Sequence, residues 1–518
     1  MQCNTKGFPL IQNQHTKRSR RLNLTTLCCC VLGSIGLLSS SASHALDYSN
    51  DDALPLLGDP VSAIVSPEDE IVLGRAYQRA LRNQMPIILD PTLNNYLRDL
   101  IRRIVAASNG ELPPIHLSLI NSSAINAFAV PGGILGVNAG LFLYSTTEAE
   151  LAAVFAHELA HLSQRHYARG IEHREKTKWA TYTGILASLA LLATSDSSTG
   201  IASILATQAV TLDAHLQFSR QNEREADRVG MESLYTAGFD PRAMPAFFGR
   251  LLQSKQFSGT EDYEFLNTHP VTKSRISDSQ ARADQLSQQI TPMRLSEVFQ
   301  FMQARIGAAY ASTPQEAVAQ YTTKLKSKPN NPIYRYGLAR AYIRNQEFDD
   351  AIAIVREADF YTNPKSEELT QYLEFALVEI EALIEKQDFS TAEKRITALF
   401  EVFPNHIPLQ YYQAKTALGL GHYSQATMVL NRLLDKDDEN LLYLEQLLIS
   451  YRDQYDQLNT LVTQARISFA RGAYGKASEH YRQALRLTDS SNLPLQAKLQ
   501  QKLREIALLQ QKLKEFSQ

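Results

Sequence analysis

The sequence has few cysteines, and none of them lies beyond its first 45 residues. Among 518 residues there are four, namely Cys3 and Cys28 to Cys30. The rest of the chain therefore contains neither disulfide bonds nor cysteine thiolates that could bind zinc.

Long apolar runs are also scarce, and the first of them belongs to a segment outside the fold. The basic run KRSRR precedes LTTLCCCVLGSIGLL, an apolar stretch of fifteen residues, and small residues lead up to Ala45. A membrane-spanning helix needs about 20 apolar residues, so this pattern is typical of a secretory signal peptide. We expect residues 1–45 to be that peptide, with cleavage after Ala45 or Ala42; an uncleaved anchor is the alternative.

The chain also has no excess of positive charge. The formal net charge is −2, and removal of residues 1–45 takes away five Lys/Arg and no Asp/Glu, which leaves −7. Nucleic acids attract strongly basic surfaces, so this charge gives no reason to expect a nucleic acid partner.

A second apolar region, residues 179–210, contains two runs around a Ser/Thr/Asp/Gly turn. The first run has about sixteen residues and the second is shorter, so both are short for a membrane span. We expect a helical hairpin that packs on the neighbouring domain. The alternative is a mobile flap that makes peripheral contact with a membrane or with a membrane-embedded client.

The stretch AELAAVFAHELAHLSQRHYARG, residues 149–170, carries the residues best suited to chemistry. Residues that cap helices flank it and apolar residues recur at helical spacing, which predicts one helix. His157 and His161 then project from the same face about one turn apart, with Glu158 next to the first. Two neutral imidazoles on a buried helix are good ligands for Zn²⁺, and the glutamate could activate a zinc-bound water without being a ligand.

The alternative is an ordinary helix with two surface histidines, so the motif needs a third ligand. In the pattern H-E-x-x-H-x-x-G-x-x-H, the third histidine would stand at the position of Tyr167. His166 is one residue out of register, and we expect it to be a structural or rim residue.

Acidic residues downstream offer a better third ligand. The stretch FSRQNEREADRVGMESLYTAGFDP, residues 218–241, predicts a second helix that contains Glu223, Glu225 and Asp227. Glu223 and Asp227 lie four apart on one face, so one can bind metal while the other orients a ligand histidine. The alternative is a solvated helix face.

HELAH followed by S-R-x-x-E-x-E-A-D resembles the zinc peptidases related to the prenyl-protein protease and the heat-shock membrane protease. NTHPVTKSRI, residues 267–276, is similar to the T-H-P segment of that family, and the resemblance covers roughly residues 67–285. It implies one zinc ion per chain, bound by His157, His161 and Glu223.

The resemblance also assigns catalytic roles to three residues. Glu158 becomes the general base, Asp227 supports a ligand histidine, and His269 approaches the metal site. Chemistry allows His269 two roles there: a fourth ligand that keeps the enzyme latent, or a donor that stabilises the transition-state oxyanion. We expect the latch; a histidine that only caps or packs a turn is the alternative.

Residues 67–290 alternate helical and strand patterns after a linker at 46–66. Helices are expected to begin at Pro67 and Pro91, a strand at 115–120, and a hairpin over 126–143 that turns at Pro131-Gly132-Gly133. We therefore expect an α+β zinc-peptidase domain, gluzincin-like, with a small antiparallel sheet. Residues 128–130 would form an edge strand that pairs with an extended substrate, and a plain core hairpin is the alternative.

Residues 291–518 are uniformly helical and repetitive. Small residues recur at spacings of 34, 41, 34 and 51, and the last spacing suggests one extra helix: Ala317, Ala351, Ala392, Ala426 and Ala477. The stretch 336–364 fits the tetratricopeptide pattern, which predicts an all-α solenoid that binds proteins. A generic helical bundle is the alternative.

We therefore expect an exported zinc metalloendopeptidase. Some members of this family have an export signal and helical repeats, as we expect of this chain. The resemblance to them implies a periplasmic location and a possible chaperone role. Its clients would be stalled or misfolded outer-membrane β-barrel precursors at their assembly machinery. The rival is a tetratricopeptide adaptor or chaperone whose zinc is latent or mainly structural. A structural zinc usually has four protein ligands, whereas three leave a position open unless His269 fills it.

Overall fold

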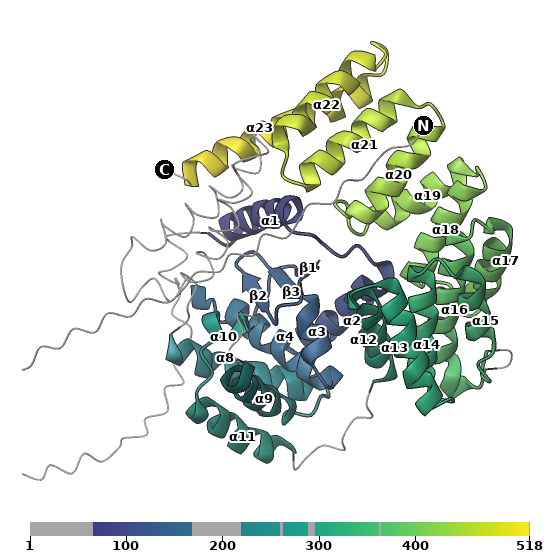
Figure 1. Ribbon diagram of the computed structural model, residues 1–518. Coiled ribbons are helices and arrows are strands. Elements are labelled where there is room, and N and C mark those ends of the chain that lie inside the picture. Colours follow the sequence, from purple (N-terminus) through teal and green to yellow (C-terminus); the bar gives the residue numbers. More distant parts are fainter. Residues whose placement is uncertain (1–65, 168–218, 259–262, 288–295, 362–363, 517–518) are drawn as a thin grey trace, which may run out of the picture. The chain divides into compact units, whose positions relative to one another are not determined.

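The computed structural model of the protein describes residues 66–167, 219–258, 263–287, 296–361 and 364–516 (Figure 1). The expected signal peptide at 1–45, most of the expected linker and the expected apolar hairpin at 179–210 lie outside these residues. Within the described ranges, no helix is both long and apolar enough to cross a membrane.

Two helices open the described chain where the prolines predict them. α1 (Pro67–Gln84) and α2 (Pro91–Ala107) each follow a capping residue, Ser66 or Asp90, whose side chain accepts a hydrogen bond from a backbone N–H three residues later. Proline suits the first turn because the N–H that it lacks would have no partner there. Both predicted starts are confirmed.

The sheet has three strands, β1 (His116–Ile120), β2 (Ala127–Val130) and β3 (Ile134–Asn138), in the order β1-β3-β2. β3 pairs antiparallel with β2 but parallel with β1, so the sheet is mixed and the expected antiparallel sheet is wrong. After β1 the chain leaves one strand position empty and forms β2 beyond it, and β3 then fills the gap between them. Strand periodicity does not predict which strands become neighbours.

The turn between β2 and β3 lies where the two glycines predict it. Gly132 and Gly133 have φ values of +84° and +82°. A Cβ on Gly132 would lie 2.3 Å from Glu70 O, and a Cβ on Gly133 would lie 2.2 Å from Pro114 O. Only glycine tolerates both restrictions. The strand pattern ends earlier than the expected 143, because α3 (Ala139–Tyr144) follows β3 directly.

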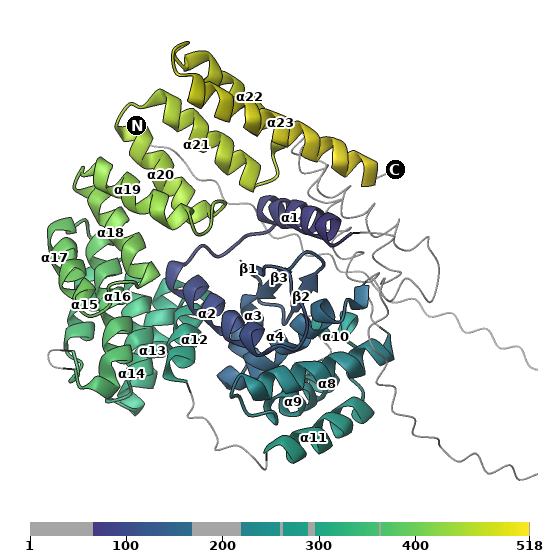
Figure 2. The same ribbon diagram turned by 180° about the vertical axis from the view of Figure 1, so that it is seen from behind.

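The HELAH motif lies on α4 (Glu148–Ser163), and the downstream acids lie on α8 (Arg220–Thr236). α4 packs between β2 and α8 (Figure 2). A Cβ on Gly230 would come within 2.8 Å of Ala156 O, so glycine permits the close approach of the two helices. This N-terminal part of the described chain continues with α9 (Ala243–Ser258), α10 (Phe265–Thr268) and α11 (Lys273–Ser287).

The rest of the described chain consists of helices that stack side by side along the sequence (Figure 1). The five repeating alanines are fully buried on α13, α15, α17, α19 and α22, and α20 is the extra helix that the 51-residue spacing suggests. These helices and one short 3-10 helix are α12 (Glu297–Tyr310), α13 (Pro314–Ser327), α14 (Pro332–Arg344), α15 (Phe348–Arg356), η2 (Ser366–Glu368), α16 (Leu369–Glu385), α17 (Phe389–Phe400), α18 (Ile407–Gly419), α19 (Tyr423–Leu434), α20 (Leu441–Asp453), α21 (Gln457–Ala470), α22 (Tyr474–Leu487) and α23 (Leu493–Phe516).

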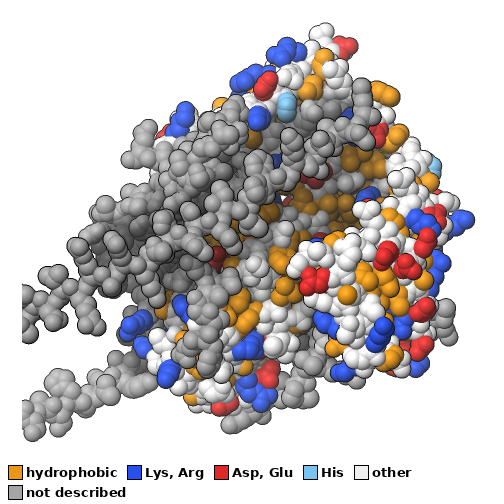
Figure 3. Space-filling view, in the orientation of Figure 1, with side chains coloured by type: hydrophobic (Ala, Val, Ile, Leu, Met, Phe, Trp, Pro, Cys, Tyr) orange, Lys and Arg blue, Asp and Glu red, His pale blue; other side chains and the backbone are white. Residues whose placement is uncertain are grey.

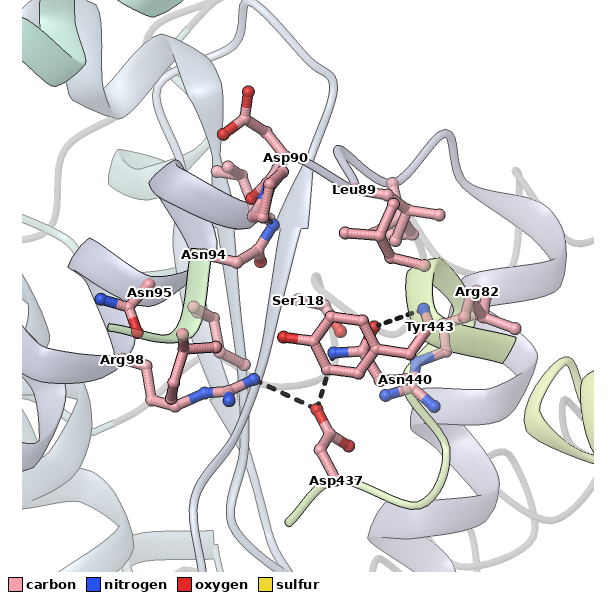
Figure 4. Close-up of a pocket in the computed structure, with 17 residues that line it drawn as sticks. Arg82, Leu89, Asp90, Asn94, Asn95, Arg98, Ser118, Asp437, Asn440 and Tyr443 are labelled. Carbon is pink, nitrogen blue, oxygen red and sulfur yellow. Dashed lines mark hydrogen bonds and ion pairs between the residues drawn. The ribbon is translucent and has the colours of Figure 1, made fainter. Parts of the chain in front are cut away.

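Helices α1 and α2 contact the repeat helices through charged side chains, which are largely buried on α1 and partly exposed on α2. Glu439 lies 2.9, 2.7 and 3.3 Å from guanidinium nitrogens of Arg75, Arg79 and Arg82 on α1. A cavity of about 60 Å³ beside it is lined by residues of α2, β1 and the start of α20, and Arg98 points to Asp437 across it at 3.1 Å (Figure 4). None of the HELAH or downstream acidic residues lines this cavity, so it is separate from the candidate site.

On the face shown in Figure 3, basic and acidic side chains are interspersed over the repeat helices, and neither sign forms one large patch. This agrees with the small net charge of the sequence.

Candidate metal centre

Helix α4 places the two motif histidines and Glu158 in the core of the N-terminal part of the described chain. All three are fully buried, and the Nε2 atoms of His157 and His161 lie 3.1 Å apart. The alternative of an ordinary helix with two surface histidines is therefore wrong. The helix ends at Ser163 rather than near Gly170, which itself lies outside the described residues.

Four potential ligands meet at one point. Side-chain atoms of His157, His161, Glu223 and His269 all lie within 4.8 Å of one another, and all four residues are buried. Glu223 Oε2 lies 3.6 Å from His157 Nε2, and Glu223 Oε1 lies 3.5 Å from His161 Nε2. Imidazole nitrogens and a carboxylate oxygen are suitable donors for a divalent transition metal, so these residues fit a metal ion.

The second helix brings Glu223 to this point from its first turn. Ser219 caps α8 by accepting a hydrogen bond from Asn222 N at 3.1 Å, and Glu223 and Asp227 face inward with exposures of 1% and 5%. Arg224 and Arg228 of the same helix are exposed. The alternative of a solvated face therefore describes the arginine side of α8 and not the two acids.

Burial and neighbouring charges set the protonation of the cluster. Burial lowers the pKa of His161 well below its usual value, which leaves the imidazole neutral. Burial would raise the pKa of Glu223, but His269 and His157 hold it well below its usual value, so the carboxylate is ionised. Metal ligands must be deprotonated, and both groups meet that condition. Burial lowers the pKa of His157, but Asp227 outweighs it and raises the pKa, so metal binding there would displace a proton.

Asp227 and Arg275 support this cluster from behind. Asp227 Oδ1 lies 3.1 Å from His157 Nδ1, on the side of the ring away from the other ligands. Arg275 donates to both Asp227 oxygens at 2.7 Å, and its Nη1 lies 2.6 Å from Glu223 Oε2. With an exposure of 2%, Arg275 is a buried cation that balances two buried carboxylates.

Sequence reasoning did not single out Arg275. It lies in the same NTHPVTKSRI stretch as His269, six residues later. The signal that could have found it is charge balance, because two carboxylates that enter a core together need a cation nearby.

Glu158 points toward the edge strand of the sheet. Its Oε2 accepts a hydrogen bond from the backbone N–H of Ala129 at 3.0 Å, and its Oε1 lies 3.3 Å from His269 Nε2. β2 has no strand neighbour on that side in the described sheet, which places Glu158 between the outer edge of β2 and the metal-binding group.

The segment after α10 carries His269 into the cluster. His269 is buried, and its Nδ1 lies 3.1 Å from Glu223 Oε1 and 3.3 Å from His157 Nε2. Its ring stacks on Phe265 with the centroids 4.6 Å apart. The structure thus brings together all six residues that the sequence proposes for the site: His157, Glu158, His161, Glu223, Asp227 and His269.

Comparison with known families gives two matches. Residues 91–283 match the model of Peptidase family M48, and residues 308–365 match a tetratricopeptide repeat model. The first range contains the whole cluster, and the family implies a metal. The second excludes the generic helical bundle.

Two bacterial relatives match most of the chain, and a mitochondrial one matches a shorter part. The putative beta-barrel assembly-enhancing protease of Vibrio cholerae is 36% identical over 332 residues, 63% of this chain and 66% of that protein, just under two-thirds of its length. The beta-barrel assembly-enhancing protease of Escherichia coli is 33% identical over 411 residues, 78% of this chain and 82% of that protein. The mitochondrial metalloendopeptidase OMA1 of Arabidopsis thaliana is 32% identical over 157 residues, 30% of this chain and 29% of that protein. The chain therefore belongs to the β-barrel assembly-enhancing proteases of peptidase family M48, metalloendopeptidases that carry tetratricopeptide repeats.

Proposed function

We propose that this metalloendopeptidase uses one zinc ion, held by His157, His161 and Glu223. Two imidazoles and one carboxylate are a common ligand set of catalytic zinc, which keeps a fourth position for water or substrate. The observation that carries the proposal is the position of Glu158, which lies beside this set and faces the outer edge of β2.

The zinc would polarise the scissile carbonyl and lower the pKa of water at the site. Glu158 is the general base in this proposal: its carboxylate takes a proton from the attacking water and passes it to the leaving amine. Asp227 acts through His157, because its carboxylate lies beside Nδ1 while Nε2 faces the other ligands.

Substrate would bind along β2. Both outward backbone groups of Ala129 are engaged by side chains: its N–H donates to Glu158, and its carbonyl accepts from the Tyr167 hydroxyl. An extended peptide could take over such contacts by main-chain pairing, which needs no particular side chain. Segments that are unfolded or looped would therefore be cleaved with little sequence preference.

His269 is proposed to keep the enzyme latent. One ring nitrogen lies within 3.3 Å of His157 and Glu223, while the other lies 3.3 Å from Glu158. In this position the imidazole can complete the metal coordination and contact the base together. Movement of the segment after α10 would then free the fourth position.

The same observation supports a second candidate function. Four protein donors are the usual number for a structural zinc site. If His269 stays bound, the chain would act mainly as a tetratricopeptide adaptor or chaperone with a latent metal.

The proposed location is the periplasm, which the protein would reach by export with residues 1–45 as a cleavable signal peptide. The proposed clients are stalled or misfolded outer-membrane β-barrel proteins, and the repeats would bind their assembly machinery. The relatives' names and the repeat match support this assignment. Peripheral membrane contact by residues 179–210 belongs to the same proposal.

The test is metal analysis of the purified protein together with casein cleavage. We expect close to one zinc per chain, loss of cleavage after chelation, and recovery when zinc is returned. Full cleavage by metal-free protein would reject the catalytic zinc, while tightly bound zinc without any cleavage would favour the adaptor.

A further inference from the structure

His166 does not lie at the rim of the site. It is buried with an exposure of 1%, and its Nδ1 lies 3.0 Å from Nδ1 of His161. Its other nitrogen, Nε2, lies 3.1 Å from Oε2 of Glu225 on α8. Glu225, His166 and His161 therefore form a continuous chain that leads from α8 to the candidate metal position.

The end of α4 has the shape that this chain needs. Residues five apart on a regular helix point about 140° away from each other, so His166 could not face His161 if α4 continued. Instead α4 ends at Ser163, and Arg165 adopts the left-handed conformation with φ of 49°. Such a conformation is costly for a residue other than glycine. The Arg165 guanidinium is tied to Glu70 on α1 at 2.9 Å, which helps to hold the turn.

One arrangement of protons satisfies both of these contacts, His161 with His166 and His166 with Glu225. Because His161 Nε2 faces the other ligands, a neutral His161 that binds metal must carry its proton on Nδ1. That proton can be donated to Nδ1 of His166 only if His166 carries its own proton on Nε2. His166 Nε2 then donates to the carboxylate of Glu225.

We propose that His166 and Glu225 are positioning residues that fix the tautomer and ring orientation of His161. They would do for His161 what Asp227 does for His157, with an imidazole inserted between the carboxylate and the ligand. The inference rests on the proposed metal site. Carboxylates that orient ligand histidines typically contribute about 10- to 100-fold to metal affinity.

The test measures metal affinity rather than catalysis. The full-length protein is stripped of metal, and Zn²⁺ is titrated in competition with a chelator of known affinity. His166→Phe should weaken zinc binding by about 10- to 100-fold, and Glu225→Gln by a smaller factor, because the amide still accepts one hydrogen bond. His166→Asn keeps an acceptor near His161 and should restore part of the loss.

A double variant shows whether Glu225 and His166 affect zinc binding through one series of hydrogen bonds or independently. If Glu225 acts through His166, adding Glu225→Gln to His166→Phe should weaken binding no further. Glu232→Gln, at an exposed position of the same helix, and His406→Phe, in the repeats, are matched controls that should bind zinc like the wild type.

Three results would overturn the inference. Unchanged zinc affinity in both single variants is the first, and multiplying effects in the double variant are the second. The third is a loss explained by lower thermal stability of the metal-free protein; if His166→Phe does not fold, Glu225→Gln carries the comparison because its side chain is 21% exposed. A wild type that binds no zinc would instead refute the proposed function.

Discussion

The contact between α4 and α8 differs from the contacts between repeat helices in the side chains that recur there. Where α4 meets α8, the buried side chains include charged and polar groups such as His157, Glu223 and Asp227. Where repeat helices meet, fully buried alanines such as Ala351 and Ala426 recur. The first contact holds donor atoms in place, and the second lets two backbones come close.

This difference teaches what each region tolerates. Buried charges are costly unless paired, so α4 and α8 keep them for chemistry that apolar residues cannot supply. Alanine supplies no chemistry, and its value in the repeats is its volume. Isosteric changes should therefore disable the first region without unfolding it, whereas changes of volume should destabilise the second without affecting the metal.

The largest expected effect comes from removing a ligand. His157→Ala, His161→Ala and Glu223→Ala should each lose zinc and reduce casein cleavage by about 10³-fold or more, because several kcal/mol of charge stabilisation is lost. Metal analysis and initial rates measure both outcomes. Glu232→Ala, at an exposed position of the same helix as Glu223, is the control. Full metal and activity in Glu223→Ala would refute the third ligand.

The second largest effect is expected from neutralising Glu439, the buried carboxylate at the contact between α1 and the repeats. Burial raises the pKa of Glu439, but Arg79, Arg75 and Arg82 outweigh it and lower the pKa from 4.5 to about 2. Because the folded state lowers this pKa, the carboxylate stabilises the protein by about 3 kcal/mol above pH 5, and the contribution is lost as the pH falls toward 2.

Glu439→Gln should therefore lower the unfolding free energy by about 3 kcal/mol at pH 7 and by progressively less at lower pH. Urea unfolding at several pH values measures this difference. A difference that does not change between pH 7 and pH 3 would show that charge is not its cause.

A smaller effect is expected from volume in the repeats. Ala351→Leu adds three carbons where no space is left and should destabilise the protein by about 1 to 3 kcal/mol, with zinc still bound. Ala353→Leu is the matched control, because Ala353 lies on the same helix and is exposed. Thermal unfolding compares the two. Equal stability of both variants would contradict the role of alanine as a spacing residue.

The smallest effect is expected at His269, where the two roles predict opposite signs. If His269 is a latch, His269→Ala should raise basal cleavage of an unfolded substrate several-fold while zinc stays bound. Lower activity with zinc retained would support stabilisation of the oxyanion instead. Unchanged kinetics would leave His269 a packing residue on Phe265.

The sequence was sufficient for features that depend on local spacing. His157, Glu158 and His161 follow from helical periodicity, the starts of α1 and α2 follow from proline and capping residues, and the alanine spacing predicts the repeats and their extra helix. Helical spacing made Glu223 and Asp227 candidates, but their separate roles and the position of His269 required the family resemblance, because no local rule brings three distant segments together.

Features that depend on tertiary contacts escaped the sequence. Arg275 is understandable only once Glu223 and Asp227 are known to be buried beside it. His166 was expected to be a structural or rim residue, because it is out of register with the longer histidine motif; its contact with His161 arises from the left-handed turn at Arg165. The mixed sheet was also missed, because the order of the strands depends on where the chain places β2 relative to β1, and strand periodicity does not show this.

The most direct test of the account compares the wild type with Glu158→Gln. In our account Glu158 is the base and not a ligand, and it lies buried beside a complete set of donors. The glutamine variant should therefore bind close to one zinc per chain and unfold at the wild-type temperature, while casein cleavage falls by about 10²- to 10⁴-fold or more. Cleavage at the wild-type rate, or loss of zinc together with activity, would contradict the assignment of the site.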